Sequence, residues 1–313
     1  MRTLRDHRNA PREMRGASAA IGNFDGVHLG HQAVLDIARR EAEAIGAPLG
    51  VVTFEPHPRE VFAPDAPPFR LMNAEARAHR LERLGVERLY ELPFDAGLVA
   101  LSPEEFARDV IADGLGLRHV VIGRDFRFGA KRAGDAQALR DLGGRLGFGV
   151  TVADLLETGG THISSTRIRT ALSDGDPRLA ATMLGHLHRI EGPVLSGERR
   201  GRTLGYPTAN MSIDGLHPPR FGVYAVEVDM ADGRGASTYG GVASIGVRPM
   251  FGENLPNIET FLFDFDGDLY GRHLSVGLVA HLRDEARFDG LDALVAQMDR
   301  DSATAREILA AVR

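Results

Sequence analysis

The sequence contains no cysteine and no tryptophan. Without cysteine the chain can form no disulfide, has no thiolate ligand for zinc and has no thiol nucleophile. It also lacks an apolar run long enough to span a membrane, and its opening residues carry arginines without an apolar core. We therefore expect no membrane segment and no signal peptide, and a cytoplasmic location.

An excess of positive charge is absent as well. The chain has 37 Lys and Arg against 43 Asp and Glu, a formal net charge of −6. Surfaces that bind nucleic acid are usually basic, so we expect no nucleic-acid partner. The 313 residues, 43% of them hydrophobic, are enough for two domains with sizeable cores. The oligomeric state stays open between a monomer and a homo-oligomer.

The first part of the chain alternates apolar strands with helical segments. Strands are expected at 18–21, 49–54, 89–92, 119–122 and 149–153, with helix caps at Asn73, Ser102 and Asp135 between them. This alternation predicts a Rossmann-like α/β domain whose parallel sheet binds ligands at the carboxyl ends of its strands. No Walker A motif is present, so phosphates must be held by other means.

After residue 184 the pattern changes to antiparallel β. Residues 222–230 alternate and are followed by the turn Asp232-Gly233, and residues 258–265 and 274–282 are further strands. We expect a small antiparallel β-barrel with a helix at its C-terminal end. The predicted domains are therefore residues 1–184 and 185–313.

The segment 21–31 reads I-G-N-F-D-G-V-H-L-G-H. His28 and His31 are three residues apart at the start of an apolar-periodic helix, so their imidazoles share one face of its first turn. Backbone N–H groups and the helix dipole make such a turn a site for phosphate, and imidazoles there can donate hydrogen bonds to a phosphoryl group in transfer. A helix start with two incidental histidines is the structural alternative.

Three more polar segments follow strands of the first part. In 53–58 (T-F-E-P-H-P) two prolines fix a turn and leave His57 pointing out of it. In 123–129 (G-R-D-F-R-F-G) aromatic and charged residues alternate, which suits stacking on a planar ring. In 163–169 (I-S-S-T-R-I-R) hydroxyls and arginines at a helix start make a second anion site. Turns and capped helices without ligands are the alternatives.

The second part carries its own polar segments. Residues 197–205 (G-E-R-R-G-R-T-L-G) are glycine-rich and basic, as expected of a flap that closes over a polyphosphate. Thr208 and Asn210 follow in Y-P-T-A-N and offer neutral oxygen ligands to Mg²⁺. Glu259, if it faces the open end of the barrel, can accept a proton from a substrate hydroxyl; a solvated strand carboxylate is the alternative.

These motifs, in this order, resemble a known family. G-x-F-D-G-x-H-x-G-H is similar to the signature of the flavin-nucleotide branch of the H-x-G-H nucleotidyltransferases, and G-R-x-L-G-Y-P-T-A-N is similar to that of riboflavin kinases. Nearly the whole chain resembles the prokaryotic bifunctional riboflavin kinase/FAD synthetase (FMN adenylyltransferase) family. The resemblance implies that the barrel converts riboflavin and ATP into FMN, that the α/β domain converts FMN and ATP into FAD and pyrophosphate, and that both steps use Mg²⁺.

The resemblance also implies roles for individual residues. Those implied to be catalytic are Glu259 as the base, His28, His31 and Arg169. Those implied to bind ATP or its phosphates are Gly22, Phe24, Asp25, Gly30, Ser164, Ser165, Thr166, Gly197, Gly201, Arg202 and Gly205. Those implied to bind the flavin are His57, Pro58, Asp125, Phe126, Phe128 and Arg248, and Thr208 and Asn210 are implied to hold the metal.

Three residues depart from the family pattern. Ser244 stands where Asn is usual, Met250 where Thr is usual, and Phe261 where a polar His is usual. The departures favour, as an alternative, an FAD synthetase with weak or absent kinase activity. A flavin-binding regulator without catalysis is a second alternative. Cytidylyltransferases and pantetheine-phosphate adenylyltransferases share H-x-G-H but lack the barrel.

Overall fold

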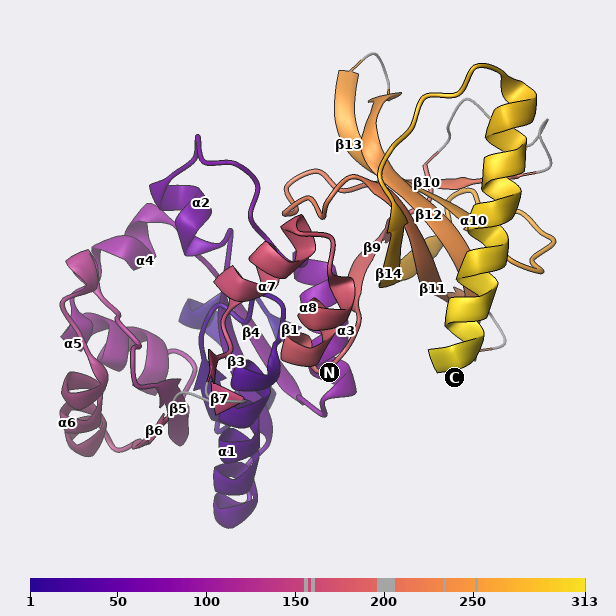
Figure 1. Cartoon of the computed structure of the whole chain (residues 1–313). Helices are drawn as coiled ribbons and strands as arrows, with labels where there is room; N and C mark the ends of the chain where they lie inside the picture. The colour runs from indigo at the N-terminus through magenta and orange to yellow at the C-terminus, as the bar shows by residue number, and fades with distance from the viewer. Residues whose placement is uncertain (155–156, 159–160, 196–205, 233–234, 251–252, 313) are drawn as a thin grey trace. The chain divides into compact units, whose positions relative to one another are not determined.

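The structure is a computed structural model that describes residues 1–154, 157–158, 161–195, 206–232, 235–250 and 253–312. The chain forms two compact units (Figure 1): Met1–Ala66 with Arg77–Ile163, and Pro67–Ala76 with Ser164–Arg313. Each unit is described by itself below. The domain boundary expected between residues 184 and 185 stays a prediction.

The first unit is built on a six-stranded parallel sheet with the strand order β1-β4-β3-β2-β5-β6. The strands are β1 Arg2–Leu4, β2 Ser18–Ile21, β3 Leu49–Glu55, β4 Arg88–Pro93, β5 His119–Gly123 and β6 Gly149–Ala153. The predicted parallel α/β sheet is confirmed. Sequence analysis missed β1, because two of its three residues are exposed and leave no apolar pattern.

Helices connect these strands. They are α1 Leu29–Ile45, α2 Pro58–Phe62, α3 Ala74–Arg83, α4 Ala96–Ala100, α5 Pro103–Glu105 with a π-helical continuation Phe106–Ala112, and α6 Ala136–Leu146. Short 3₁₀ turns lie at His7–Asn9, Arg12–Met14 and Ala130–Arg132, and β7 Glu157–Thr158 pairs with β8 Thr161–His162. The predicted caps are confirmed: Asn73, Ser102 and Asp135 accept hydrogen bonds from the N–H groups of Ala76, Glu105 and Ala138.

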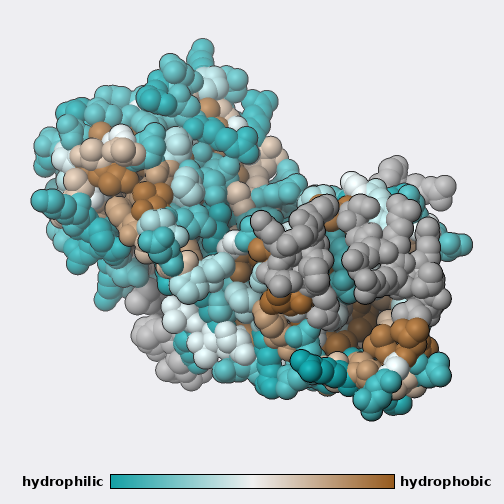
Figure 2. Space-filling view, turned by 90° about the horizontal axis from the view of Figure 1, so that it is seen from above, coloured by the Kyte–Doolittle hydropathy of each residue, from teal (hydrophilic) through white to brown (hydrophobic). Residues whose placement is uncertain are grey.

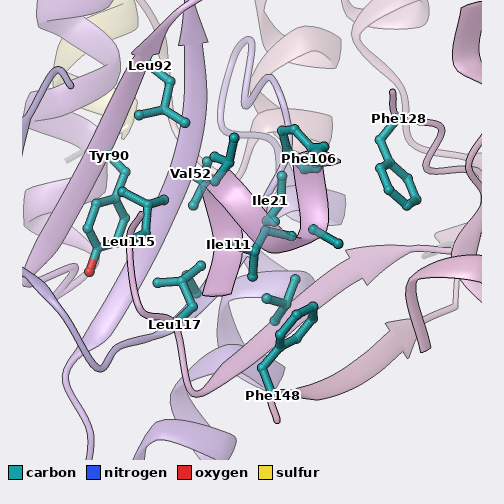
Figure 3. Packing of buried hydrophobic residues seen from close by; sticks show 14 of the residues in the cluster. Ile21, Val52, Tyr90, Leu92, Phe106, Ile111, Leu115, Leu117, Phe128 and Phe148 are labelled. Atoms are coloured by element: carbon teal, nitrogen blue, oxygen red, sulfur yellow. The ribbon is translucent and has the colours of Figure 1, made fainter. Parts of the chain in front are cut away.

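Large apolar side chains fill the space between sheet and helices in the first unit (Figure 3). Ile21, Val52 and Tyr90 lie on three neighbouring strands, β2, β3 and β4. Ile111 lies in the π-helical segment, and Leu115 follows that segment by three residues. The Tyr90 hydroxyl donates a hydrogen bond to a backbone carbonyl, so this buried polar group is satisfied. The packing fixes the sheet whose carboxyl edge carries the polar loops.

The second unit is a nearly closed antiparallel barrel with the strand order β10-β13-β12-β11-β14-β9. The strands are β9 His188–Pro193, β10 Ala209–Ser212, β11 Gly222–Asp232, β12 Gly235–Met250, β13 Glu253–Leu262 and β14 His273–Arg283. The Leu195 N–H donates to the Asn210 carbonyl at 2.8 Å and joins the two edges. The predicted barrel is confirmed.

Helices α7 Ser165–Ser173 and α8 Pro177–Leu184 precede the barrel, and α10 Leu291–Val312 ends the chain. The barrel interior holds Ile258 and other alternate strand residues, while Phe261 and Phe263 point outward and pack with Ala305 and Leu309 of α10. Helix α10 therefore packs on the outer face of the barrel, mainly against β11 and β12.

On the face drawn in Figure 2, hydrophilic residues cover most of the area and hydrophobic residues form separate groups. Across the described part of the chain, no helix has both the length and the apolar character needed to cross a bilayer.

Candidate active sites

The loop after β2 ends in a stacked pair of histidines. His28 caps helix α1, and its Nδ1 accepts a hydrogen bond from the backbone N–H of His31 at 3.3 Å. The two imidazole rings are nearly parallel, with centroids 3.7 Å apart. Because Nδ1 of His28 is an acceptor, the proton of the neutral ring lies on Nε2. The expected placement of both imidazoles on one face of the first helical turn is confirmed.

Burial sets the charge of the second histidine. Desolvation lowers the pKa of His31 well below its usual value, and neighbouring His28 adds to this effect. Nδ1 of His31 is buried and has no hydrogen-bond partner among the described residues. His31 is therefore neutral at pH 7, and it can act on a bound phosphate as a hydrogen-bonding group rather than as a cation.

The loop itself has a strained backbone. Phe24, Gly26 and Val27 have φ angles of 51°, 85° and 41°, and two of these residues are not glycine. A residue other than glycine in this region costs about 1–3 kcal/mol and persists only where its surroundings hold it, so the cost falls on Phe24 and Val27. Phe24 is 1% exposed and its ring lies 5.0 Å from that of His31, so the strained turn is packed against the histidine pair.

The small residues of the loop leave room for these rings. A Cβ on Gly30 would lie 3.1 Å from the His28 imidazole, and one on Gly22 would lie 3.4 Å from the Phe24 ring. Asp25, also predicted to bind phosphate, is buried at 5% exposure. The loop is thus a compact shell around the histidine pair.

A buried arginine of helix α3, Arg77, donates a hydrogen bond to the backbone of this loop. Arg77 is 2% exposed, and its Nη2 donates to Glu55 at 2.9 Å and to Glu91 at 3.1 Å. Its Nη1 donates to the carbonyl of Asn23 at 3.5 Å, and the Thr53 hydroxyl donates to the same carbonyl at 3.2 Å. Sequence analysis missed Arg77, because an arginine in a helix ordinarily indicates the solvent face.

Arg77→Ala should destabilise the first unit strongly. The substitution leaves the carboxylate of Glu91, which is 5% exposed, without its buried partner. We expect the free energy of unfolding to fall by about 3–5 kcal/mol, measured by urea denaturation. The matched control is Arg83→Ala, an exposed position of the same helix, which should change stability by about 0.5 kcal/mol or less. Equal effects of the two variants would contradict this role of Arg77.

The turn after β3 differs from expectation. His57 does not point out of the turn: it is 8% exposed and caps α2, accepting the Arg59 N–H at 3.1 Å, with Pro58 as the first helical residue. The ring is held inward because its Nδ1 accepts a backbone N–H that would otherwise be unpaired at the start of α2. The exposed ring here belongs instead to Phe62, which is 65% exposed and meets Phe94 edge-on at 5.6 Å. Sequence analysis did not single out Phe62, since one aromatic residue in a short helix carries no pattern.

The aromatic pair after β5 divides into a buried and an accessible ring. Phe128 is 6% exposed and packs on Phe106 at 5.6 Å within the core. Phe126 is half-buried and stacks on Phe128, with ring centroids 5.7 Å apart, while Asp125 next to it is exposed. Phe128 thus supports the ring of Phe126.

Residues 164–169 of the predicted anion-binding motif 163–169 lie in the second unit. Ser164 caps α7 by accepting the Arg167 N–H at 3.4 Å, and Ser165 and Thr166 form the first turn. The Arg169 guanidinium donates to the carbonyl of Phe69 and lies 5.3 Å above the Phe69 ring. The predicted capped helix start with a following arginine is therefore present.

Three polar residues form a row across the barrel strands. Glu259 of β13 lies directly opposite Asn210 of β10 and directly opposite Ser244 of β12. Residues opposite one another share a face of the sheet. This is the outer face, because the alternate residues Ile258 and Thr260 are fully buried toward the interior. The pairing brings together the predicted base, a predicted metal ligand and one of the departing residues.

A pocket of about 190 Å³ begins at the same strand. Thr208 and Asn210 line it together with the turn Phe265–Tyr270. Asn210 therefore both lines the pocket and lies opposite Glu259 on the neighbouring strand. Four predicted residues, Gly197, Gly201, Arg202 and Gly205, lie outside the described residues, and for Arg248 and Met250 only the backbone position in β12 is described.

The fold and these two sites define a class. An α/β unit with imidazoles at a helix start and a barrel with a carboxylate beside a polar pocket are parts of a two-domain enzyme that transfers phosphate-containing groups. Residues 10–167 match the family model of FAD synthetase, and residues 184–309 match that of riboflavin kinase. The chain belongs to the family of bifunctional riboflavin kinase/FMN adenylyltransferases.

Individual relatives agree with this family. The chain is 44% identical to the bifunctional riboflavin kinase/FMN adenylyltransferase of Pseudomonas fluorescens, over 99% of this chain and 98% of that protein. It is 41% identical to that of Escherichia coli K12, over 98% of this chain and 96% of the relative. Among solved structures, one described as a macrolide-efflux protein from Streptococcus pneumoniae matches with a TM-score of 0.82 and 32% identity, covering 97% of this chain and 98% of that one.

Proposed function

We propose that this protein makes FAD from riboflavin in two ATP-dependent steps, one in each of the two domains predicted from the sequence. The barrel domain phosphorylates riboflavin to FMN, and the α/β domain joins FMN to AMP. The observation that carries this proposal is the presence, on one chain, of the stacked His28–His31 pair at a helix start and the Asn210–Glu259 row beside a pocket. FMN adenylyl transfer and riboflavin phosphorylation need these two different kinds of site.

In the kinase step, Glu259 is the general base. The 5′-hydroxyl oxygen of riboflavin bonds to the γ-phosphorus of ATP, its proton passes to Glu259, and the bond between the γ-phosphorus and the β–γ bridging oxygen breaks to release ADP. ATP occupies the pocket with its triphosphate toward Asn210. The opposition of Asn210 and Glu259 supports this arrangement, because it puts the base next to the phosphate end of the pocket.

Thr208 and Asn210 suit Mg²⁺ in the presence of ATP. Their side chains supply neutral oxygen ligands, which Mg²⁺ accepts when phosphates provide the negative charge. Among the residues that the structure describes, no group of three or more His, Cys, Asp or Glu side chains could hold a metal by itself. When bound, Mg²⁺ neutralises charge that develops on the phosphates.

In the adenylyltransferase step, FMN itself is the nucleophile. An oxygen of its ionised phosphate bonds to the α-phosphorus of ATP, and the bond from that phosphorus to the α–β bridging oxygen breaks to release pyrophosphate. No protein base is required. His28 and His31 donate hydrogen bonds to the α-phosphate, and Ser165 and Arg169 stabilise the leaving pyrophosphate.

The remaining predicted residues surround these groups. Gly22, Phe24, Asp25 and Gly30 form the shell of the histidine loop, and Ser164 and Thr166 complete the hydroxyl cluster of α7. For the flavin of the adenylyltransferase step we propose Phe126, supported by Phe128, together with Asp125 and the turn at His57 and Pro58, where Phe62 adds an exposed ring. For the flavin of the kinase step we propose Arg248. A cytoplasmic location belongs to the same proposal, and so does a phosphate-covering flap at 197–205, which lies outside the described residues. The oligomeric state stays open between a monomer and a homo-oligomer.

One chromatogram of products tests the proposal. With riboflavin, ATP and Mg²⁺, we expect FMN to appear first and FAD after it; with FMN supplied, we expect FAD and pyrophosphate. Chelation of Mg²⁺ with EDTA should stop both reactions. FAD from supplied FMN, but no FMN from riboflavin, would favour the alternative in which Ser244, Met250 and Phe261 have weakened the kinase. Turnover of neither step would leave a flavin-binding protein.

A further inference from the structure

The segment that forms one wall of the barrel pocket is preceded by a residue that is hydrogen-bonded to helix α10. Tyr206 directly precedes Pro207–Asn210, which line the pocket. Its hydroxyl donates a hydrogen bond to Asp299 of α10, and its ring lies 4.8 Å from that of Phe261. Burial and the bond to Asp299 raise the pKa of Tyr206, so the phenol keeps its proton and remains a donor.

The segment Phe265–Tyr270, which forms another wall of the pocket, is also preceded by a residue that contacts helix α10. Asp264 directly precedes Phe265–Tyr270, and its backbone φ of 57° is unusual for a residue with a side chain. Arg306 of α10 donates to both carboxylate oxygens of Asp264, at 2.8 and 2.9 Å, and lies 4.2 Å above the ring of Phe263. A bidentate pair of this kind fixes orientation as well as distance.

Helix α10 is itself fastened to the barrel between these two contacts. Asp301 is 6% exposed and accepts hydrogen bonds from Arg283 of β14 at 2.8–3.1 Å and from Gln297 at 2.8 Å. Asp299 and Arg306 are separated by about two helical turns, so they lie on nearly the same side of α10, about 10 Å apart along its axis. The two pocket walls are therefore tied to one rigid element.

We infer that Asp299 and Arg306 are positioning residues for the kinase reaction, which hold two walls of the pocket at the spacing that ATP requires. The inference rests on the proposed kinase function of this pocket. The side chains of Arg306 and Asp264 are 51% and 77% exposed, and exposed ion pairs add little to global stability. Their effect is local, on the shape of the pocket, and it is felt in ATP binding more than in the chemical step.

Kinetics of FMN formation test this inference. Tyr206→Phe and Arg306→Ala should each raise the KM for ATP about 3- to 10-fold, the effect of losing one hydrogen-bonded contact, while kcat and the KM for riboflavin stay nearly constant. Asp299→Asn still accepts the Tyr206 hydroxyl and should retain most of the affinity. The matched control is Arg300→Ala, whose guanidinium donates hydrogen bonds to Gln297 of the same helix. FAD formation from supplied FMN should not change in any of these variants.

Hydrogen exchange provides a readout that needs no kinase activity. In Tyr206→Phe, peptides that cover 207–212 should exchange faster, and in Arg306→Ala peptides that cover 264–270 should exchange faster, with Arg300→Ala like the unchanged protein. Unchanged exchange in both segments, or an unchanged KM for ATP, would overturn the inference. Faster exchange in a protein that forms no FMN would instead overturn the proposed kinase function and leave the tie between α10 and the pocket intact.

Discussion

Replacing both His28 and His31 by alanine should lower the rate of FAD formation from FMN by about 10²–10³-fold, the usual loss when donors to a developing oxyanion are removed. The rings are stacked at 3.7 Å, so the double variant removes the whole imidazole surface of the loop. FMN formation from riboflavin should be unchanged, because it takes place in the barrel. The measurement is the initial rate of each product by chromatography.

Two controls separate chemistry from structure in this experiment. His28→Asn keeps a side-chain acceptor for the His31 N–H, so α1 stays capped while the ring is lost. It should lose FAD formation without a large fall in stability. The second control is His119→Ala. His119 is the first residue of β5 and so lies at the amino ends of the strands, away from the loop at their carboxyl ends, and its replacement should leave both rates unchanged. Loss of both activities in the His28/His31 variant would contradict separate sites.

Glu259→Gln should produce the opposite pattern. The amide has nearly the same shape as the carboxylate but cannot take the proton of the riboflavin hydroxyl, so FMN formation should fall by about 10²–10⁴-fold. FAD formation from supplied FMN should persist at its full rate. Two time courses of product formation, one started from riboflavin and one from FMN, measure the two steps separately.

Glu307→Gln is the matched control for this variant. It removes one negative charge from the same unit, at an exposed position of α10, and should leave both rates unchanged. If Glu259→Gln still makes FMN at the normal rate, Glu259 is a solvated strand carboxylate and another group accepts the proton. If its KM for ATP rises while kcat is constant, Glu259 contributes to binding rather than to proton transfer.

Local patterns in the sequence predicted most of the regular structure. The apolar strands of the first unit and the caps at Ser102 and Asp135 depend on interactions within a few residues, and all are confirmed. β1 was missed because it is an edge strand with exposed residues, which pairs with β4 only in the folded sheet. Its existence depends on a partner far along the chain.

Orientation was harder to predict than position. His57 was expected to point outward, yet it turns inward because its ring accepts a backbone N–H at the start of α2. Phe128 was grouped with Phe126, but packing on Phe106 buries it. In both cases the residue type fits more than one environment, and the choice is made by neighbours that the local sequence does not identify.

The sequence by itself determined the two kinds of chemistry, since hydroxyls, imidazoles and a carboxylate stand at the ends of predicted helices and strands. Only the tertiary structure decided which of them meet. The register of β13 puts Glu259 opposite Asn210 and on the outer face, and the packing of α3 buries Arg77 beneath the carbonyl of Asn23. Such contacts join segments that are distant in the chain, and strand register and burial are set by the packing of the whole unit rather than by local spacing.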